Sequence, residues 1–537
     1  MTLRNLPPTR RFILVALITV SIALIAAAAP GRLVADETPA AALERMARGQ
    51  FGALSTAEVR MLDGAPERML TWCGTSHNGN DASNDPTKAS TWGADRTIRA
   101  PLLIWLMSDP HASTYVHPSG IGLGGARISG VLDLSFLKVE TPITLVDCAI
   151  DDGINLSDAE TQSIALRKDS TGAVEAMRLR VHGDFSMAAG SYAVLDLYRA
   201  AIEGDLDLSG GHFTAEDDNA VSVIEADIGG DAIFHDGFTS EGMVDLRLSR
   251  IGGSLSFNDA RFIGNGANGL NAERTRVAGT FYWTDITMNP HTVLDLEDAH
   301  VATLWDSIEC WPAPGNLMIN GLVYESFGES PDDAQQRLKW LALQPPGYYP
   351  QPYNQLAEVL RANGRDDAAT DVMIAKRDQQ LEFGHLTFSE RVWQRLLKIT
   401  LGYGYHPLQA LWLMIGFVVL GSLLFRLGYR VGVITPTEAG AFRQFIDSGH
   451  PPDHYPPFNC FVYSLENFLP LVDLFQGIHW RPNPLRMRER EVRLAGININ
   501  LGKIEGTALR AYLWLHVLAG WILTPLFVAG LSGLVRS

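Results

Sequence analysis

The stretch Ile251-Gly252-Gly253-Ser254-Leu255-Ser256-Phe257 is one of eight similar phrases between Gly122 and about Asn320. Each phrase opens with Ile or Val, usually has Gly two positions later, and continues with two apolar residues spaced by two. The phrases open at Ile128, Ile150, Val181, Ile202, Ile228, Ile251, Val277 and Val301, with Asp152 and Thr303 replacing Gly in the second and the last. Successive starts are 22, 31, 21, 26, 23, 26 and 24 residues apart. A repeat of this length indicates a solenoid, in which each unit buries its apolar face only by stacking on its neighbours.

Apolar residues alternate strictly within each phrase, which is the period of a strand with one buried face. A second short alternating run precedes most phrases, as at Ile143-x-Leu145, and a small residue such as Ala200 lies where a corner is expected. The Gly positions fit corners or places where one backbone passes close to another. We therefore predict a mainly β fold, a parallel β-helix or solenoid of about eight coils over residues 121–330. At about 4.8 Å per coil the stack would measure roughly 40 Å.

Charge is distributed unevenly along the chain. Residues 36–331 contain 43 acidic and 19 basic residues, a net charge of −24. The residues from Asp332 onward contain 17 acidic and 20 basic residues, and the first 35 residues add four positive charges. Binding to a nucleic-acid backbone needs clustered Lys and Arg, so the acidic solenoid argues against a nucleic-acid partner. Its outward acidic residues predict a solvated surface, with cation binding as the alternative.

The amino-terminal part precedes the repeat. Residues 1–35 have the layout of a signal peptide or signal anchor, because Arg4, Arg10 and Arg11 precede an apolar run over 12–29. Either interpretation places Asp36 and the following residues outside the cytoplasm. Residues 36–120 contain short helical patterns and are expected to form a helical cap, since the end of a solenoid exposes apolar surface and unpaired strand edges.

Helical patterns follow the repeat over residues 331–400. Residues 353–363 and 365–380, on either side of Gly364, are similar to one hairpin of the tetratricopeptide type. A single hairpin of this type favours a structural cap over a peptide receptor. A third helix, over about 388–398, is amphipathic and basic, so we expect it to lie on lipid headgroups just before the membrane.

Residues 401–537 form the predicted membrane domain. Spans are expected near 407–427 and 511–535, because residues 407–425 and 511–535 are uncharged and apolar over about the length that crosses a bilayer. Lys and Arg near the apolar segments are more frequent at the amino-terminal end, with Arg4, Arg10 and Arg11, and in the connection 426–510 than on the opposite side of the spans. The positive-inside rule therefore places this connection in the cytoplasm and the solenoid outside it.

The connection contains the candidate functional segment. Residues 458–473 predict a short apolar helix near Tyr463, Glu466 and Asp473, with Trp480 shortly after it. Such a helix fits either an interfacial position, which is our preferred interpretation, or a segment that re-enters the bilayer. Span, short helix and span is also the plan of a pore domain, so a channel- or transporter-like protein using residues 458–480 is an alternative. Residues 469–473 do not supply the run of carbonyls found in a potassium filter.

Known chemical motifs give no assignment. HExxH, GxSxG and P-loop patterns do not occur, and the cysteines at 73, 148, 310 and 460 lack the spacing of zinc or iron–sulfur ligands. Residues 264–269 match GxGxxG, but Leu270 opens a short strand where a dinucleotide site needs a helix. We assign no catalytic, cofactor-binding or metal-binding residue and no cofactor. His516, inside the second span, is expected to be a polar group satisfied between helices.

Several strings together resemble a family of uncharacterised bacterial membrane proteins with pentapeptide-like β-solenoid repeats. Besides the Gly-Ala-x-Ile-x-Gly coils, the matching strings are Ile98-Arg99-Ala100, Gly402-Tyr403-Gly404-Tyr405-His406-Pro407, Tyr463-Ser464-Leu465-Glu466, Leu469-Pro470-Leu471-Val472-Asp473-Leu474, Trp480-Arg481-Pro482, Gly520-Trp521-Ile522-Leu523-Thr524 and Ala529-Gly530-Leu531-Ser532-Gly533-Leu534. The match covers most of residues 90–537. The resemblance implies a bacterial inner-membrane protein. Members are sometimes labelled membrane-associated oxidoreductases, but no redox residue can be carried over to this chain.

These patterns predict a membrane-anchored, non-enzymatic β-solenoid protein that acts as an envelope scaffold or binding module. Its expected partners are the lipid bilayer and either other envelope proteins or a second copy of the chain. The solenoid is expected on the periplasmic side. A channel-like protein and an oxidoreductase are the alternatives.

Overall fold

The computed structural model describes residues 37–532 except Thr75, Asn80, 216–218, 265–267, Arg486 and 495–496, and it leaves out the side chains of 268, 487–494 and 497–504. The predicted signal segment over 1–35 and the end of the second predicted span beyond 532 therefore lie outside the described residues. The chain divides between Pro345 and Pro346 into two compact units, here called the solenoid unit and the helical unit.

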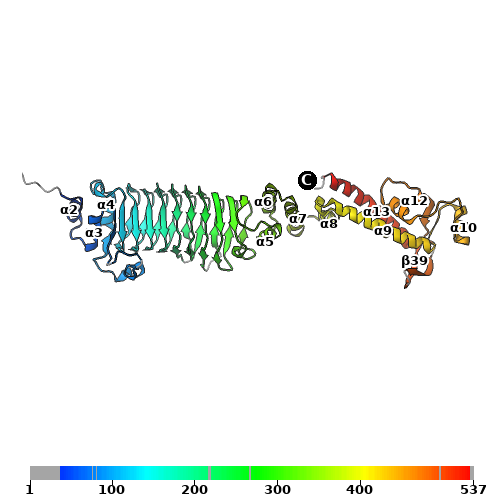
Figure 1. The fold of residues 1–537 in the computed structure, drawn as a ribbon, viewed down its shortest axis with the longest axis horizontal. Helices are drawn as coiled ribbons and strands as arrows, with labels where there is room; N and C mark the ends of the chain where they lie inside the picture. Colours follow the sequence, from blue (N-terminus) through cyan, green and yellow to red (C-terminus); the bar gives the residue numbers. More distant parts are fainter. Residues whose placement is uncertain are drawn as a thin grey trace, which may run out of the picture. The chain divides into compact units, whose positions relative to one another are not determined.

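Coils of short parallel strands build the solenoid unit (Figure 1). Each full coil contributes one strand to a first sheet, one to a second sheet and two strands, or one long strand, to a third. The first sheet contains β2 (Thr97–Arg99), β4 (Arg127–Ser129), β8 (Ala149–Ile150), β12 (Ser170–Thr171), β16 (Ser191–Tyr192), β20 (His212–Phe213), β24 (Thr239–Ser240), β28 (Arg261–Phe262) and β31 (Thr287–Met288). The second contains β5 (Leu132–Asp133), β9 (Ile154–Asn155), β13 (Val174–Glu175), β17 (Leu195–Asp196), β21 (Asn219–Ser222), β25 (Met243–Asp245), β29 (Asn268–Asn271), β32 (Val293–Asp295) and β34 (Leu317–Met318).

The third sheet has seventeen strands and forms the remaining sides of the coils. They are β1 (Leu70–Trp72), β3 (Ile121–Gly124), β6 (Lys138–Val139), β7 (Ile143–Val146), β10 (Glu160–Thr161), β11 (Ile164–Arg167), β14 (Arg180–Val181), β15 (Phe185–Ala188), β18 (Ala201–Ile202), β19 (Leu206–Asp207), β22 (Asp227–Ile228), β23 (Ala232–Ile233), β26 (Arg250–Ile251), β27 (Leu255–Ser256), β30 (Arg276–Trp283), β33 (His300–Asp306) and β35 (Val323–Phe327). The predicted mainly β parallel solenoid is confirmed.

The solenoid has about nine coils, one more than the eight that the phrases predict, as the two nine-stranded sheets show. Ile150 lies in the first sheet and pairs with Thr171, whereas Val181 lies in the third sheet and pairs with Thr161. The 31 residues between Ile150 and Val181 therefore contain about one and a half coils. Two opposite corners of each coil have similar apolar patterns. The phrase lies at one of these corners up to Ile150 and at the other from Val181 onward, so the number of phrases is lower by one than the number of coils.

The repeated glycines form a column that runs through successive coils. A Cβ on Gly230 would overlap the carboxylate of Asp205 and would lie 3.0 Å from the carbonyl carbon of Gly204. The Asp205 carboxylate lies there because it accepts a hydrogen bond from the backbone N–H of Asp231 at 2.8 Å. The carboxylate of Asp231 does the same for the N–H of Ser254 at 2.6 Å. Glycine is therefore needed because neighbouring coils approach closely here, which is one of the two roles that the sequence predicts.

Left-handed residues other than glycine form many corners. Arg199 and Asp298 have φ values of 57° and 54°, a conformation that is costly for residues with a Cβ. An aspartate three positions earlier stabilises the corner, because Asp196 accepts the N–H of Tyr198 at 2.9 Å and Asp295 accepts the N–H of Glu297 at 3.0 Å. These outward acidic residues, expected to be a solvated surface, are also structural caps.

Aromatic side chains fill the middle of the stack. Phe234 stacks on Phe257 with ring centroids 4.7 Å apart, and Phe257 lies 5.6 Å from Trp283. All three side chains are fully buried. Offset and edge-to-face aromatic pairs add to the free energy of burial, so successive coils are held by packing as well as by strand pairing.

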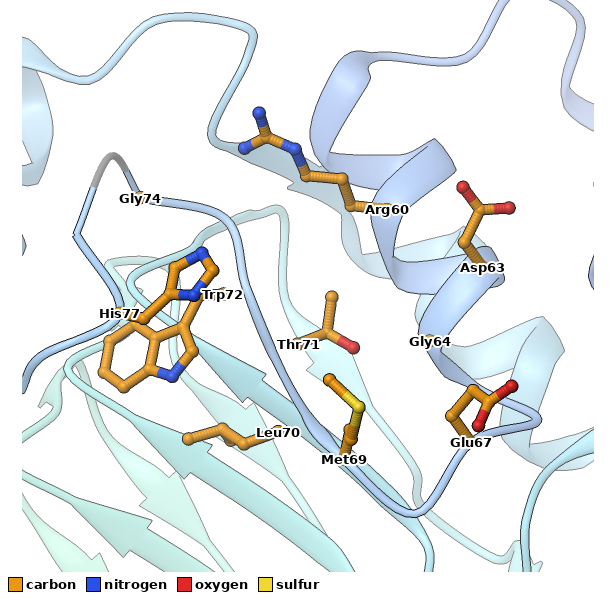
Figure 2. Close-up of a pocket in the computed structure, with 10 residues that line it drawn as sticks. All are labelled: Arg60, Asp63, Gly64, Glu67, Met69, Leu70, Thr71, Trp72, Gly74 and His77. Carbon is orange, nitrogen blue, oxygen red and sulfur yellow. The ribbon is translucent and has the colours of Figure 1, made fainter.

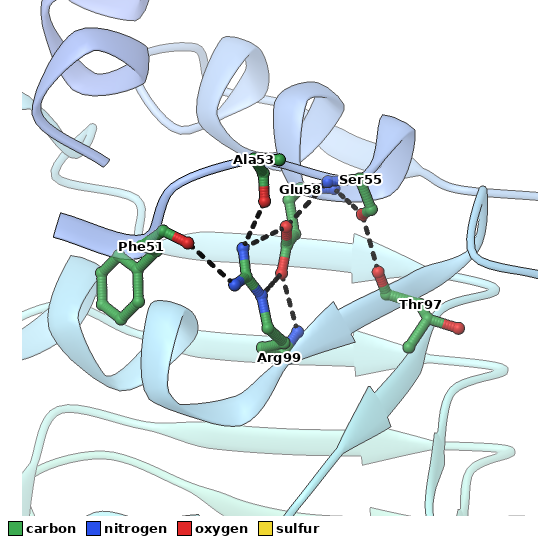
Figure 3. A network of polar contacts seen from close by, with 6 residues as sticks. All are labelled: Phe51, Ala53, Ser55, Glu58, Thr97 and Arg99. Atoms are coloured by element: carbon green, nitrogen blue, oxygen red, sulfur yellow. Dashed lines mark hydrogen bonds and ion pairs between the residues drawn. The ribbon is translucent and has the colours of Figure 1, made fainter. Parts of the chain in front are cut away.

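Helices close both ends of the solenoid. At the amino-terminal end lie α2 (Pro39–Phe51), α3 (Thr56–Gly64), α4 (Ala100–Ser108) and the 3-10 helices η2 (Ala82–Asn84), η3 (Pro86–Thr91) and η4 (Ser113–Tyr115). Figure 3 shows the contact that joins them, in which Arg99 donates to both oxygens of Glu58, at 2.6 and 2.8 Å, and to the carbonyls of Phe51 and Ala53. At the other end, beyond η5 (Ile308–Cys310), α5 (Ala334–Leu341) places Arg337 in a buried ion pair with Asp306 at 2.6 Å.

The helical unit begins with the predicted hairpin, α6 (Pro350–Ala362) and α7 (Asp366–Phe383), which flank Gly364. It continues with α8 (Phe388–Leu401) and η6 (Gly402–Gly404). The predicted spans correspond to α9 (Pro407–Arg430) and α13 (Gly506–Leu531), the two described helices that are long and apolar enough to cross a membrane. Between them lie β36 (Ile434–Pro436), α10 (Ala439–Ser448), α11 (Cys460–Phe468), α12 (Gln476–His479), β37 (Trp480–Pro482), β38 (Met487–Leu494) and β39 (Ile497–Glu505).

Candidate functional site

The helices α9 and α13 pack antiparallel, and α11 lies along half of their length. Phe425, near the end of α9, contacts Tyr512, near the start of α13, with ring centroids 5.6 Å apart. Phe468, at the end of α11, lies 6.0 Å from Phe417 in the middle of α9. A Cβ on Gly520, in the middle of α13, would overlap the carbonyl oxygen of Phe468. The short helix therefore reaches the midpoint of both candidate spans.

His516 joins the three helices from inside. Its side chain is fully buried, and Nε2 donates to the carbonyl oxygen of Ser464 at 3.0 Å. Nδ1 then accepts from the hydroxyl of Tyr512 at 3.4 Å, while the hydroxyl of Ser464 donates to the carbonyl of Val418 at 2.9 Å. The expectation that His516 is satisfied between helices is confirmed.

A cavity of about 500 Å³ lies where α11, α12, β37 and the first turns of α13 meet. Three of the four candidate residues line it: Tyr463, Glu466 and Asp473. Trp480 does not line it. Its fully buried ring packs against Tyr429 and Phe445, and its Nε1 donates to the carbonyl of Pro456 at 3.1 Å, so its role is in the hydrophobic core.

Tyr463 supplies a hydroxyl to the cavity from a buried position. The residue is 1% exposed, and its ring contacts Phe425 edge to face at 4.9 Å. The aromatic ring of Tyr463 is tightly packed, but the hydroxyl that it carries has no hydrogen-bond partner in the described part of the chain. The hydroxyl oxygen is not among the buried polar atoms that lack a partner, so it borders the open space of the cavity and is available to a ligand.

The two carboxylates of the cavity have different surroundings. Glu466 accepts the backbone N–H groups of Gln476 at 2.7 Å and Gly477 at 3.0 Å, and so fixes the first turn of α12. Asp473 is exposed and accepts the N–H of Phe475 at 2.9 Å through one oxygen. Glu466 is therefore held by two backbone N–H groups, whereas Asp473 is exposed and is held by one.

Two arginines complete the cavity, and the sequence analysis did not select either. Arg481 follows Trp480 in β37, and Arg510 lies in the first turns of α13, where its guanidinium lies 5.6 Å from the ring of Trp514. Among the described residues neither forms an ion pair with a carboxylate. A sequence signal existed, because Arg481 belongs to a string that carries the family resemblance and Arg510 borders the apolar run. Only the fold shows that the two line one cavity.

Two other cavities lie in the solenoid unit. One of about 540 Å³ lies beside α3 and β1 and is lined by Asp63, Glu67, Trp72 and His77 among others (Figure 2). Burial and the nearby Glu44 raise the pKa of Asp63. The other, of about 520 Å³, crosses the third sheet over Arg250, Arg276 and His300. Neither contains a residue that the sequence analysis selected, so the cavity of the helical unit is the candidate site.

The described residues contain no group of three or more His, Cys, Asp or Glu side chains that could hold a metal ion. All four cysteines are free. The fold and site thus define a parallel β-solenoid protein with two candidate membrane-spanning helices and a charged cavity beside them. No protein-family model, no curated protein and no solved structure matches this chain.

Proposed function

We propose that the chain is a membrane-anchored scaffold or binding module of the bacterial envelope, with its solenoid on the periplasmic side of the inner membrane. The observation that carries this proposal is the outward apolar surface of α9 and α13. Both helices contain few charged residues, yet several of their large apolar side chains are at least 60% exposed: Trp412, Leu423, Trp514 and Leu518. Soluble proteins rarely expose contiguous apolar surface of this extent, and a bilayer covers it.

The same setting gives α11 a place in the membrane. Because α11 lies beside α9 and α13 as far as their midpoints, it re-enters the bilayer in this proposal. The backbone of this helix is satisfied internally, and Leu469, which follows the helix, packs against the cluster that contains Met414 and Leu523 of the two spans. This arrangement favours the re-entrant position that the sequence left open over the interfacial one. The solenoid supplies a long regular surface for partners, either other envelope proteins or a second copy.

Fractionation and protease accessibility test the proposal. The full chain should stay in the membrane pellet through high salt and alkaline carbonate and should dissolve only in detergent. Protease added to intact spheroplasts should digest the solenoid, while a tag inserted at the exposed turn near Gly449 should be protected. Release by carbonate would contradict the anchoring. Protection of the solenoid, with digestion of the tag, would reverse the orientation.

A further inference from the structure

The cavity of the helical unit contains charges of both signs that do not neutralise one another. Glu466, Asp473, Arg481 and Arg510 all line it. In the described part of the chain no salt bridge joins either carboxylate to either guanidinium. Opposite charges that share about 500 Å³ gain free energy by pairing, unless the fold holds them apart. Two separated cationic and two separated anionic groups complement a ligand that itself carries both charges.

The backbone holds this separation in place. The N–H groups of α12 bind Glu466 on one side of the cavity. Asp473 lies in a loop between Leu471 and Phe475, whose φ values are 68° and 63°. A left-handed backbone is unfavourable for a residue with a Cβ. Bulky residues persist in it where the surrounding structure requires that conformation, as commonly happens at ligand sites.

Apart from Asn467, the other side chains that line the cavity are apolar, and this apolar lining continues onto the outer face of α13. Ile478 and Trp514 line the cavity and are 54% and 65% exposed, and Leu518 on the next turn of α13 is 60% exposed. Leu513 and Val517 connect the charged end to this face. A ligand with a dipolar head and hydrocarbon chains would place its head among the charges and its chains along α13. Basic pockets beside transmembrane helices bind phospholipid headgroups in the same way.

We propose that this cavity holds the headgroup of one bilayer phospholipid that carries an amine. Arg481 and Arg510 bind its phosphate, the hydroxyl of Tyr463 donates to a phosphate oxygen, and the ammonium lies toward Glu466 and Asp473. Arginine suits the phosphate because its planar group donates two parallel hydrogen bonds. This inference rests on the proposed function, since the ligand comes from the bilayer around α9 and α13.

Native mass spectrometry of the full chain, released from vesicles of defined composition, tests the inference. Vesicles of phosphatidylethanolamine, phosphatidylglycerol and phosphatidylcholine are compared, each at the same protein concentration. We expect one retained phosphatidylethanolamine per chain and weaker retention of the other two lipids. The paired substitutions R481Q and R510Q should lower retention by about tenfold or more, because two charge-assisted contacts are lost. R426Q, an exposed arginine in α9 that does not line the cavity, is the matched control and should behave as the wild type.

Two milder variants keep the test valid if the paired arginine variant fails to fold. Tyr463→Phe keeps the packed ring and removes only the hydroxyl, and Asp473→Asn changes an exposed residue. The first should weaken retention of all phosphate lipids, and the second should reduce the preference for phosphatidylethanolamine. Equal retention in these variants and in R426Q, or no preference among the three lipids, would overturn the inference. Failure of the chain to sediment with any vesicle would instead overturn the proposed function.

Discussion

At the residue scale, the glycine of each repeat is explained by its neighbour in the preceding coil. The Gly-Asp pairs at 204–205 and 230–231 act together, because each carboxylate crosses the next glycine to reach a backbone N–H. The repeated phrases in the sequence predict that glycine is required, and their spacing predicts the positions at which it is required. It does not show that the cause is a carboxylate from another coil, because that contact joins residues more than twenty positions apart.

Gly230→Ala should therefore destabilise the solenoid. The new methyl group meets the Asp205 carboxylate and the Gly204 backbone, so coils must separate locally, and overpacking of this kind costs about 1–3 kcal/mol. The midpoint of loss of the β signal in circular dichroism, measured on heating, should fall. Gly49→Ala is the control, because nothing lies within 4 Å of its Cβ position and alanine favours the helix. Equal midpoints for the two variants would contradict the explanation.

Asp169 should make the stability of the solenoid depend on pH. The side chain is fully buried, with one oxygen accepting the N–H of Cys148 at 2.6 Å and the other without a partner in the structure. Burial, reinforced by the nearby Asp147, raises the pKa of Asp169 well above its usual value. Because the pKa of Asp169 is higher in the folded state than in the unfolded state, the free energy of unfolding is greatest below the unfolded pKa of about 3.9. It falls as the pH rises toward the folded pKa.

Asp169→Asn keeps the acceptor for Cys148 and removes the ionisation. The wild type should therefore lose stability relative to this variant as pH rises from 4 to 8. Unfolding midpoints of both proteins across this range measure the effect, and Asp133→Asn, a change at an exposed corner, controls for the loss of one acidic group. A difference between wild type and variant that stays constant with pH would contradict the role of Asp169.

At the element scale, the strands of the solenoid and the helices that follow it could be predicted because their apolar periods are local. The number of coils could not, since the phrase moves by half a coil between Ile150 and Val181 and only strand pairing shows this. The elements β36, β37 and α10 were not expected. Their strands are three residues long, and β36 pairs with a strand more than forty positions away. Such pairing leaves little trace in a local pattern.

The local stability of the amino-terminal helices α2, α3 and α4 should depend on one ion pair, which Glu58 forms with Arg99. Glu58 is 1% exposed and accepts hydrogen bonds from the side chain of Arg99 and from the backbone N–H of Ser55. The Ser55 bond caps α3, and the Arg99 bonds join α3 to the first residue before α4. Hydrogen bonding to Ser55 and Arg99 lowers the pKa of Glu58 despite the opposing effect of burial. Glu58→Gln removes the charge without changing the size, so local opening of α2, α3 and α4 should become easier by about 2–3 kcal/mol.

Hydrogen exchange detected by mass spectrometry measures this opening, since it reports local stability along the chain. Glu37→Gln is the control, because it breaks the exposed ion pair with Arg45, which solvent screens, and it should leave the exchange of these helices almost unchanged. If the two variants exchange alike over α2 to α4, the network of Glu58 is not what holds the cap.

At the scale of the whole molecule, the candidate site was only partly predictable. The unusual apolar connection drew attention to Tyr463, Glu466 and Asp473, and the structure places all three at one cavity. Trp480 was selected for the same reason and belongs to the core instead, because an aromatic residue that closes a core and one that binds a ligand look alike in sequence. Arg510 lies 44 positions after Glu466, so only the packing of α13 against α11 brings them to the same cavity.

The division at Pro345 predicts that the solenoid unit folds without the helical unit. Its coils end at helices on both sides, with Arg99 and Glu58 at one end and the buried pair of Arg337 and Asp306 at the other, and these capping helices all belong to the solenoid unit. A chain of residues 37–345 should remain in solution, give the circular dichroism spectrum of β structure and stay in the supernatant when vesicles are sedimented. The full chain should sediment with the same vesicles, because α9 and α13 supply the apolar surface. If residues 37–345 bound vesicles as strongly as the full chain does, the membrane attachment would belong to the solenoid, and the assignment of α9 and α13 as the anchor would be wrong.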